Sequence, residues 1–351
     1  MPSARVIGGG IGALCCAALL RRKGWDVTLC LPPKTQSPAV VLNAVTIQII
    51  HDIFGDVNYL LQDAQPIKRH YINWGDNRPD EFTPCSAFAL TADVLSARLF
   101  DLLKQDSQLI IAGESDADSK FDWDIYAANG QRTIIPPRRF GRRSAICVDV
   151  TLHDDGDSTT SFIEATPGGW LFLAPVARGR AVLQAVVPEK PADVVQTTRA
   201  LLDPTKQIKR IVKDLADAAF TVECAPKKLD RMDGPNWLAT GTAACSYDPL
   251  CGDGTGYAIR AAILAAAVLD GIDRETKKES LLTYYKLRLT YAFYTHLRSC
   301  LSLYSSASFN HIWRRELSMM EDGLGKVEQE LSNMSTTQYQ LNGFELLAMS
   351  A

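Results

Sequence analysis

Glycine occupies four of the five positions from Gly8 to Gly12, and alanine follows at Ala13. In the spacing GxGxxA, the first glycine permits a tight turn, the second lets the backbone approach a pyrophosphate, and the alanine allows close helix–sheet packing. A helix beginning near residue 11 would also offer free N–H groups and partial positive charge to phosphates. We therefore predict a dinucleotide site at Gly8, Gly10, Ile11, Gly12 and Ala13.

The elements around these glycines are those that such a site needs. Residues 4–7 are predicted to form a buried strand, residues 11–23 a helix and Asp26–Leu31 a second strand, which makes one βαβ unit. A dinucleotide site usually has Asp or Glu at the end of the second strand, to bind the adenosine ribose. Leu31 stands there, and Lys34 is the nearest charged residue and suits a phosphate. The grip on the cofactor is therefore predicted to be weak.

A second glycine-rich stretch runs from Pro249 to Gly256 and leads into an alanine-rich helix predicted over 254–269. It is either another anion site at a helix N-terminus or an ordinary turn before a buried helix. Pro249, Gly252 and Gly254 match the P-x-x-G-x-G motif of the FAD-dependent aromatic hydroxylases and flavin halogenases, so the chain resembles that superfamily.

That resemblance implies a fold like that of p-hydroxybenzoate hydroxylase, with FAD as cofactor. The loop that lies against the isoalloxazine would be formed by Pro249, Gly252, Asp253, Gly254, Thr255 and Gly256. Thr242 replaces the aspartate with which relatives contact the ribityl or pyrophosphate group. Thr91-Ala92 stands where relatives usually carry an arginine that touches the flavin. These departures again predict weak, reversible FAD binding.

A third stretch, Gly168–Pro175, is similar to the sheet motif G-x-W-x-W-x-I-P of the same enzymes. Its alternation predicts a strand, and either one face lines a substrate pocket or the strand belongs to the core. The candidate pocket residues are Trp74, Trp170, Phe172 and Pro175.

The halogenases carry a lysine eight residues before an Asn-Trp pair, and this chain has Pro66 there, which favours oxygen transfer over halogenation. A narrower resemblance is to the small flavoproteins that hydroxylate a precursor protein's tryptophan during the maturation of tryptophylquinone enzymes. The aromatic C-terminal segment, which includes Tyr291 and Tyr304, would either bind such an acceptor or pack as core.

Composition limits the other classes of function. A net charge of −3 argues against nucleic-acid binding. Nine cysteines without metal-ligand spacing suit free thiols in a reducing compartment, so we expect no metal and a cytoplasmic location. No membrane span is expected, and the basic cluster Arg21–Lys23 follows the first apolar run, unlike a signal peptide.

The predicted fold class is α/β: a Rossmann-like FAD domain with an inserted antiparallel β-sheet substrate domain and a helical C-terminal extension. The FAD domain would comprise 1–65, 91–142 and 230–272. The substrate domain would comprise 66–90 and 143–229, with an amphipathic helix over Lys206–Ala219, and the extension 273–351.

The predicted function is that of a flavin-dependent monooxygenase that hydroxylates an aromatic ring through C4a-hydroperoxyflavin, with NAD(P)H as a candidate reductant. The acceptor would be an aromatic small molecule or a tryptophan in a precursor protein. The flavin performs the oxygen activation, so the sequence identifies no catalytic side chain, and His70 and His296 are either bases or structural residues. The alternatives are a halogenase and a non-catalytic homologue that has lost tight FAD binding.

Overall fold

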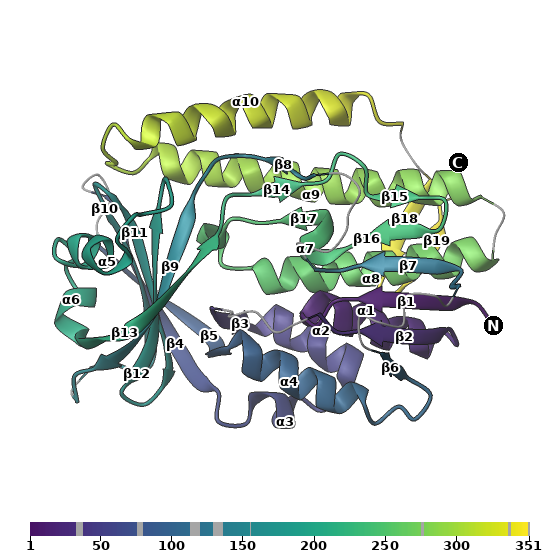
Figure 1. Cartoon of the computed structure of the whole chain (residues 1–351), viewed down its shortest axis with the longest axis horizontal. Coiled ribbons are helices and arrows are strands. Elements are labelled where there is room, and N and C mark those ends of the chain that lie inside the picture. Colours follow the sequence, from purple (N-terminus) through teal and green to yellow (C-terminus); the bar gives the residue numbers. More distant parts are fainter. Residues whose placement is uncertain are drawn as a thin grey trace.

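Two β-sheets and a pair of long C-terminal helices make up the fold (Figure 1). The computed structural model describes residues 1–32, 38–75, 80–112, 120–128, 136–154, 156–274, 277–335 and 338–349. Of the predicted site residues, Lys34 lies outside this description.

The first sheet is Rossmann-like and has the strand order β15-β16-β7-β1-β2-β6. All described neighbours in it are parallel except β15 and β16. The carboxyl ends of β1, β2, β7 and β16 therefore meet at one edge, where the predicted dinucleotide turn follows β1. The strands are β1 (Ser3–Ile7), β2 (Asp26–Cys30), β6 (Ile110–Ala112), β7 (Trp123–Tyr126), β15 (Asp233–Gly234) and β16 (Trp237–Ala239).

Helix α1 (Ile11–Arg22) packs against α8 (Gly254–Arg274) and α4 (Ala92–Leu103). Small side chains make the close approach of α1 and α8 feasible, since both helices are rich in alanine and both are buried along most of their length. By length and composition α8 could cross a membrane, but 72% of its apolar window is buried inside the protein. Its apolar character is therefore accounted for by core packing.

The second sheet has eight strands in the order β13-β9-β12-β11-β10-β4-β5-β3. The predicted strand runs between 143 and 187 are confirmed as β9 to β12, and they pair antiparallel in the order β9-β12-β11-β10. The sheet as a whole is mixed, because β10 pairs parallel with β4. The strands are β3 (Ala39–Asn43), β4 (Gln65–Asn73), β5 (Glu81–Thr91), β9 (Ser144–Leu152), β10 (Thr160–Thr166), β11 (Gly169–Ala177), β12 (Arg180–Val187) and β13 (Val212–Glu223).

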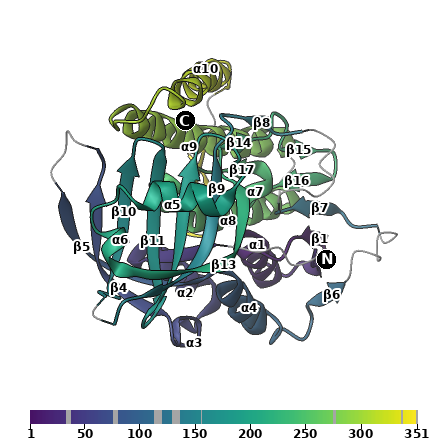
Figure 2. The same ribbon diagram turned by 60° about the vertical axis from the view of Figure 1, so that its left-hand side comes forward.

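The outer face of this sheet is covered by α5 (Val194–Leu202) and α6 (Ile208–Ile211), as Figure 2 shows. The predicted helix over Lys206–Ala219 is wrong: it is the single turn α6 followed by β13. The Glu164 carboxylate accepts from the backbone N–H of Gln207 and Ile208, at 2.8 and 2.7 Å, and fixes the turn. Beyond it the chain pairs with the edge of β9, so tertiary pairing overrides the helical spacing.

Helices α2 (Ala44–Phe54) and α3 (Val57–Leu61) lie in the chain between β3 and β4 of the large sheet, and α2 packs against α1, α4 and α8. The strand β3, predicted within the 1–65 segment of the FAD domain, pairs with β5 in the large sheet. A small sheet joins β8 (Arg138–Arg139), β14 (Lys227–Lys228) and β17 (Cys245–Ser246). In the chain, β8 lies between β7 and β9, and β14 lies between β13 and β15, so both strands belong to segments that cross from one larger sheet to the other.

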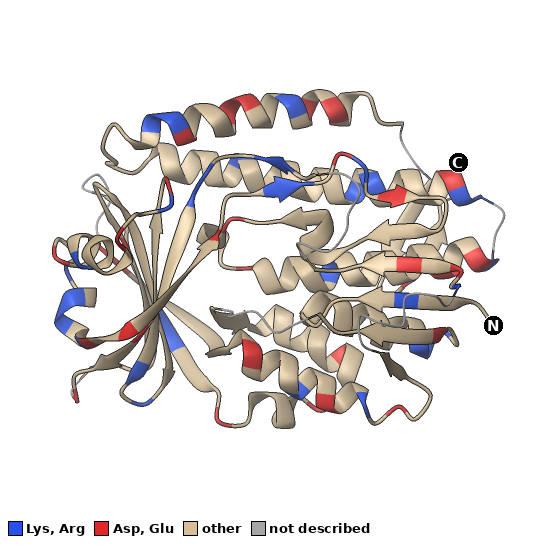
Figure 3. Cartoon of the chain, in the orientation of Figure 1, with Lys and Arg blue, Asp and Glu red and all other residues tan. Residues whose placement is uncertain are grey.

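The C-terminal helices α9 (Lys278–Ser305) and α10 (Trp313–Ser332) pack side by side and extend along both large sheets (Figures 1 and 2). Acidic and basic side chains are interspersed along α10 (Figure 3). After these helices the chain forms a hairpin of β18 (Tyr339–Asn342) and β19 (Glu345–Ala348), which contacts α8. The predicted helical extension therefore ends in a β-hairpin.

Candidate cofactor site

The glycines in the turn after β1 have different physical roles. Gly8 has φ +150°, its N–H donates to the Cys30 carbonyl at 2.9 Å, and an added Cβ would lie 3.0 Å from the Ala13 Cβ. Gly8 is thus required by the turn itself. Gly10 is exposed, and an added Cβ there would meet no atom within 4 Å. The protein leaves open space over Gly10.

Helix α1 begins directly behind this open space. Gly10 is its N-cap and provides no side-chain cap, and no acidic residue lies in the first turn. The N–H groups of Ile11, Gly12 and Ala13 belong to the first turn of an α-helix, whose donors have no intrahelical partner. An uncapped helix N-terminus beside open space fits a pyrophosphate.

The structure brings the two glycine-rich stretches together. A Cβ on Gly12 would lie 3.6 Å from the Gly241 Cα and 3.5 Å from the Ala258 carbonyl oxygen, so the start of α1 touches both α7 (Gly241–Ala244) and α8. Thr242 is exposed in α7, just beyond β16, and its hydroxyl lies 3.5 Å from the Ala127 carbonyl oxygen directly after β7. Gly12 and Gly241, which are 229 positions apart in the chain, therefore border one edge of the sheet.

Leu31 lies at the same edge, directly after β2. It is half-buried, and its Cδ2 would lie 3.6 Å from a Cβ added to Gly9. Its side chain offers no acceptor to a ribose hydroxyl. The position predicted to lack the usual acid is therefore placed next to the glycine turn.

The loop before α8 is held by local hydrogen bonds. The Asp248 carboxylate accepts from the Leu250 N–H at 2.9 Å and starts the turn η1 (Pro249–Cys251), and Gly252 closes it with φ +64°. The Asp253 carboxylate accepts from Arg260 at 2.7 Å and folds over the first turn of α8, where a Cβ on Gly256 would lie 2.2 Å from it. Gly256 thus makes room for Asp253.

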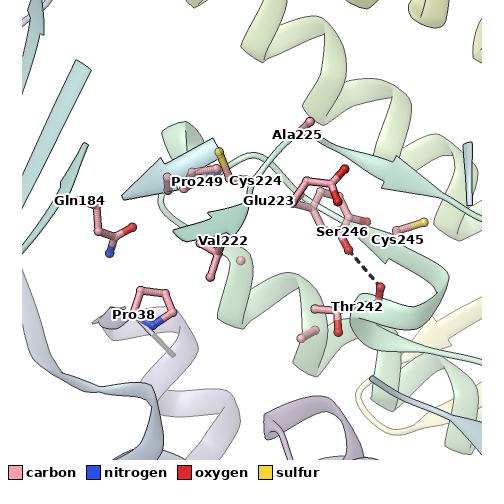
Figure 4. A pocket seen from close by; sticks show the side chains of 14 residues that line it. Pro38, Gln184, Val222, Glu223, Cys224, Ala225, Thr242, Cys245, Ser246 and Pro249 are labelled. Carbon is pink, nitrogen blue, oxygen red and sulfur yellow. Dashed lines mark hydrogen bonds between the residues drawn. The ribbon is translucent and has the colours of Figure 1, made fainter. Parts of the chain in front are cut away.

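A cavity of about 240 Å³ lies between this loop and the large sheet (Figure 4). Thr242, Pro249 and Gly254 of the predicted cofactor set line it, together with Ala145 and Gln184 from the sheet. The other lining residues are Pro38, Val222, Glu223, Cys224, Ala225, Cys245, Ser246, Tyr247 and Ala258. The cavity is therefore bounded on one side by the start of α8 and on the other by the large sheet.

Tyr247 lines both this cavity and a second one of about 400 Å³. Its ring stacks on Tyr257, with centroids 4.0 Å apart and planes 11° apart. Burial raises the pKa of Tyr247 well above its ordinary value, so the hydroxyl stays protonated near neutral pH.

A buried charge cluster supports the loop from behind. The Arg143 guanidinium donates to Asp248 at 2.9 Å and to Glu316 at 2.6 Å, and all three side chains are almost inaccessible to solvent. Burial disfavours the charged form, but the attraction of the two carboxylates raises the pKa of Arg143 above its ordinary value. The Tyr304 hydroxyl donates to Asp248 at 3.1 Å. Sequence spacing could not reveal this cluster, since Arg143 and Glu316 are 173 positions apart.

A second cluster contacts the loop through sulfur. The Cys251 and Cys300 sulfurs lie 3.4 Å apart, and the Cys300 sulfur lies 3.4 Å from Nε2 of His296. The ligand-type atoms of these residues lie within 4.8 Å of one another. Cys251 and Cys300 are 49 positions apart, so the absence of closely spaced ligand pairs in the sequence could not reveal this group. His296 accepts from the Asp248 backbone N–H, which is a structural role.

The predicted substrate residues do not line the two cavities and pack elsewhere in the protein. Trp74 and Trp170 are buried, and their indole N–H groups donate to the Leu303 carbonyl at 2.8 Å and the Tyr304 hydroxyl at 3.1 Å. Pro175 is buried and Phe172 is half-buried on β11. These four residues do not line either cavity described above, so their role toward a substrate stays a prediction.

The aromatic residues of α9 divide between core and surface. Tyr284, Tyr285, Phe293 and Tyr304 are buried, whereas Tyr291 is 58% exposed. Most of these aromatic side chains therefore pack in the core, which was one of the two predicted alternatives. Of the two candidate bases, His70 lies in β4 with Nδ1 2.6 Å from the Ser161 hydroxyl, and burial lowers its pKa.

Comparison with known proteins gives a match at the level of fold. No family model matches the chain, and no curated protein sequence matches it. Among solved structures, the peptidyl tryptophan dihydroxylase QhpG, essential for tryptophylquinone cofactor biogenesis, is similar over 90% of this chain and 78% of its own, with a TM-score of 0.76 and 18% identity. The flavin-dependent halogenase CmlS is similar over 94% and 70%, with a TM-score of 0.78 and 17% identity.

A third structure, Klebsiella pneumoniae HpxO complexed with FAD and uric acid, is similar over 95% of each chain, with a TM-score of 0.66 and 16% identity. The chain therefore has the fold found in FAD-dependent monooxygenases and halogenases. This agrees with the predicted fold class and with the resemblance drawn from the glycine motifs.

Proposed function

We propose that this protein is an FAD-dependent monooxygenase that hydroxylates an aromatic ring. The observation that carries the proposal is the open space over Gly10 at the uncapped N-terminus of α1, on the same sheet edge as Thr242, which lines the 240 Å³ cavity. A dinucleotide with a ring system at one end needs both features. The fold shared with QhpG, CmlS and HpxO supports the same cofactor.

The residues present fit FAD at its pyrophosphate and ring ends. The backbone N–H groups of residues 11–13 would bind the pyrophosphate, and the loop Pro249–Gly256 would lie along the ring. At the adenosine end Leu31 supplies no acceptor, so we propose that FAD exchanges readily. When bound, FAD supplies the oxygen activation.

The protein's own contribution is positioning and exclusion of water. Gln184 reaches into the cavity from the large sheet, and its amide NH₂ lies 3.4 Å from the Ala39 carbonyl oxygen, which leaves the amide oxygen as an acceptor for a substrate N–H (Figure 4). Ala145 and Val222 provide apolar walls beside it. An electron-rich ring with an N–H group, such as an indole, fits this combination.

We propose a tryptophan in a precursor protein as the acceptor, ahead of a free aromatic small molecule. The fold similarity to QhpG, described as a peptidyl tryptophan dihydroxylase, supports this choice. Halogenation is less well supported, because β4 carries Pro66 where the halogenases carry their lysine. We further propose NADH or NADPH as the reductant and a reducing, cytoplasmic compartment, which suits nine free cysteines.

The test begins with cofactor binding. The purified protein is titrated with FAD while flavin fluorescence is followed, and then incubated with NADH or NADPH, oxygen and candidate acceptors. We expect saturable quenching and an acceptor product heavier by one or more oxygen atoms.

Two other outcomes of this experiment would favour the alternative functions. A chlorinated or brominated product in the presence of halide would favour the halogenase. Failure to bind FAD at any concentration would favour a non-catalytic binding protein and overturn the proposal.

A further inference from the structure

We propose that Cys251 and Cys300 are a thiol pair that hydroperoxides oxidise to a disulfide, which cross-links the loop at the start of α8 to helix α9. The inference goes beyond the proposed function and does not depend on it, because no cofactor takes part in the reaction. It rests on the positions of two sulfur atoms and on their different exposure.

Contact between the sulfurs is already present. Their distance of 3.4 Å is a van der Waals contact, and Cys251 belongs to the turn η1 whereas Cys300 lies within α9. A disulfide needs an S–S distance of about 2 Å, so a shift of little more than an ångström would form it. Cys251 stands in a short turn between Pro249 and Gly252, whose φ of +64° is a conformation that glycine adopts without strain.

The two cysteines differ in access to solvent, as the two partners of an oxidisable pair should. Cys251 is partly exposed, whereas Cys300 is fully buried. A peroxide can therefore reach Cys251 first, and Cys300 is placed to react with the oxidised sulfur. The Cys300 S–H can donate to the Cys251 sulfur, 3.4 Å away. This hydrogen bond favours a thiolate at Cys251.

The chemistry balances in two steps. The Cys251 thiolate attacks one oxygen of the hydroperoxide, the O–O bond breaks, and a sulfenic acid and water form once the leaving oxygen takes a proton. The Cys300 sulfur then attacks the Cys251 sulfur, the S–O bond breaks, and the departing hydroxide takes the Cys300 proton. Two thiols and one hydrogen peroxide give one disulfide and two water molecules.

A metal is the competing occupant of the same cluster. Zinc would require Nε2 of His296 as a ligand, but that atom already accepts from the Asp248 backbone N–H at 2.8 Å. Binding a metal would leave this buried N–H without its acceptor, at a cost in free energy. The hydrogen bond therefore favours a thiol pair over a metal site.

The experiment treats the purified protein with hydrogen peroxide, blocks free thiols with N-ethylmaleimide, and maps peptides without reduction. Trypsin leaves Cys245 and Cys251 in one peptide, so a protease that cleaves before aspartate is added to separate them at Asp248. We expect a Cys251–Cys300 cross-linked peptide that dithiothreitol abolishes. In Cys300→Ser, dimedone should trap a sulfenic acid at Cys251.

Cys85, a partly buried cysteine on β5, provides the internal control for exposure to peroxide. The proposal would be overturned if Cys85 were oxidised while Cys251 and Cys300 stayed free. It would also be overturned if the untreated protein contained one equivalent of zinc whose removal by a chelator made both thiols reactive. FAD binding, measured separately, decides the proposed function, so the two proposals fail independently.

Discussion

The backbone N–H of Asp248 donates a hydrogen bond to Nε2 of His296, with 2.8 Å between the nitrogens. Both residues are buried, and they join the loop before α8 to the middle of α9. Because Nε2 is the acceptor, the ring proton must be on Nδ1, which has no partner among the described residues. Helix α9 thus fixes the loop that is proposed to lie along the flavin.

Replacing His296 should therefore destabilise the protein. His296→Ala removes the acceptor and leaves a buried N–H unsatisfied, which costs about 1–3 kcal/mol of unfolding free energy, as measured by urea denaturation. His296→Gln retains an acceptor oxygen and should recover part of the loss. His311→Ala, at an exposed position, is the control and should change stability little. Equal stability of His296→Ala and wild type would contradict this role.

Glu316 on α10 should stabilise the same loop through Arg143. Glu316→Gln removes one of the two carboxylates that compensate the buried guanidinium, while Asp248 remains. We expect a loss of about 1–3 kcal/mol in unfolding free energy. Glu321→Gln on the same helix is exposed and should be neutral. If both variants unfolded at the same urea concentration, the cluster would not be stabilising the fold.

The glycines and the period of the apolar residues made the Rossmann-like part predictable. Its turn, helix and strands depend on local backbone requirements, such as the positive φ of Gly8 and the cap that Thr91 provides for α4. The same local logic failed at Lys206–Ala219. There the decisive contacts are the edge of β9 and the Glu164 carboxylate, and neither is visible from the segment itself.

The site was predictable only where its chemistry lies in contiguous residues. The turn at Gly8 and the loop at Pro249 each carry a motif, and the structure brings them together through Gly12 and Gly241. The cluster of Cys251 and Cys300 could not be predicted, since helix α9 returns to the loop only after 49 positions. For the same reason, the partnership of Trp170 with Tyr304 was not predictable from the strand motif.

Gly10 and Gly8 should respond differently to alanine. Gly10→Ala adds a Cβ into open space, so the fold should be unchanged while FAD affinity falls about tenfold or more, because the pyrophosphate needs this approach. Gly8→Ala places a Cβ 3.0 Å from that of Ala13 at φ +150° and should cost about 1–3 kcal/mol of stability.

Gly325→Ala in α10 is the matched control for Gly10→Ala, since its Cβ also meets open space. It should leave FAD affinity unchanged and stabilise the helix by about 0.5–1 kcal/mol. Flavin fluorescence and thermal melts separate these outcomes. Unaltered FAD affinity in Gly10→Ala would place the cofactor elsewhere.

An acid at position 31 should strengthen FAD binding. Leu31→Glu supplies the acceptor that the ribose hydroxyls lack, and one hydrogen bond of about 1–1.5 kcal/mol corresponds to about tenfold tighter binding. Ile110→Glu adds the same charge at an exposed position of the neighbouring strand β6 and should not change affinity. Affinity is measured by fluorescence titration at constant ionic strength. Equal effects of both variants would assign the change to net charge instead of the ribose contact.

Cys251 should react as a thiolate at an unusually low pH. The hydrogen bond from Cys300 outweighs burial and lowers the pKa of Cys251 from its ordinary value near 9 to about 5, against the opposing charge of Asp248. Its rate of alkylation by iodoacetamide should therefore be constant near neutral pH and fall as the pH drops through about 5. Because a lowered pKa favours the folded thiolate, the stability that this thiolate contributes is fully present above the ordinary pKa near 9. It is lost progressively as the pH falls from there through the lowered pKa of about 5. In Cys300→Ala the donor is gone, and the midpoint of the alkylation profile should move up toward pH 9.

Cys85 is the internal control, because burial raises its pKa and its alkylation profile in the same peptide map should shift in the opposite direction. A wild-type midpoint at the ordinary value would show that the two thiols do not share a proton.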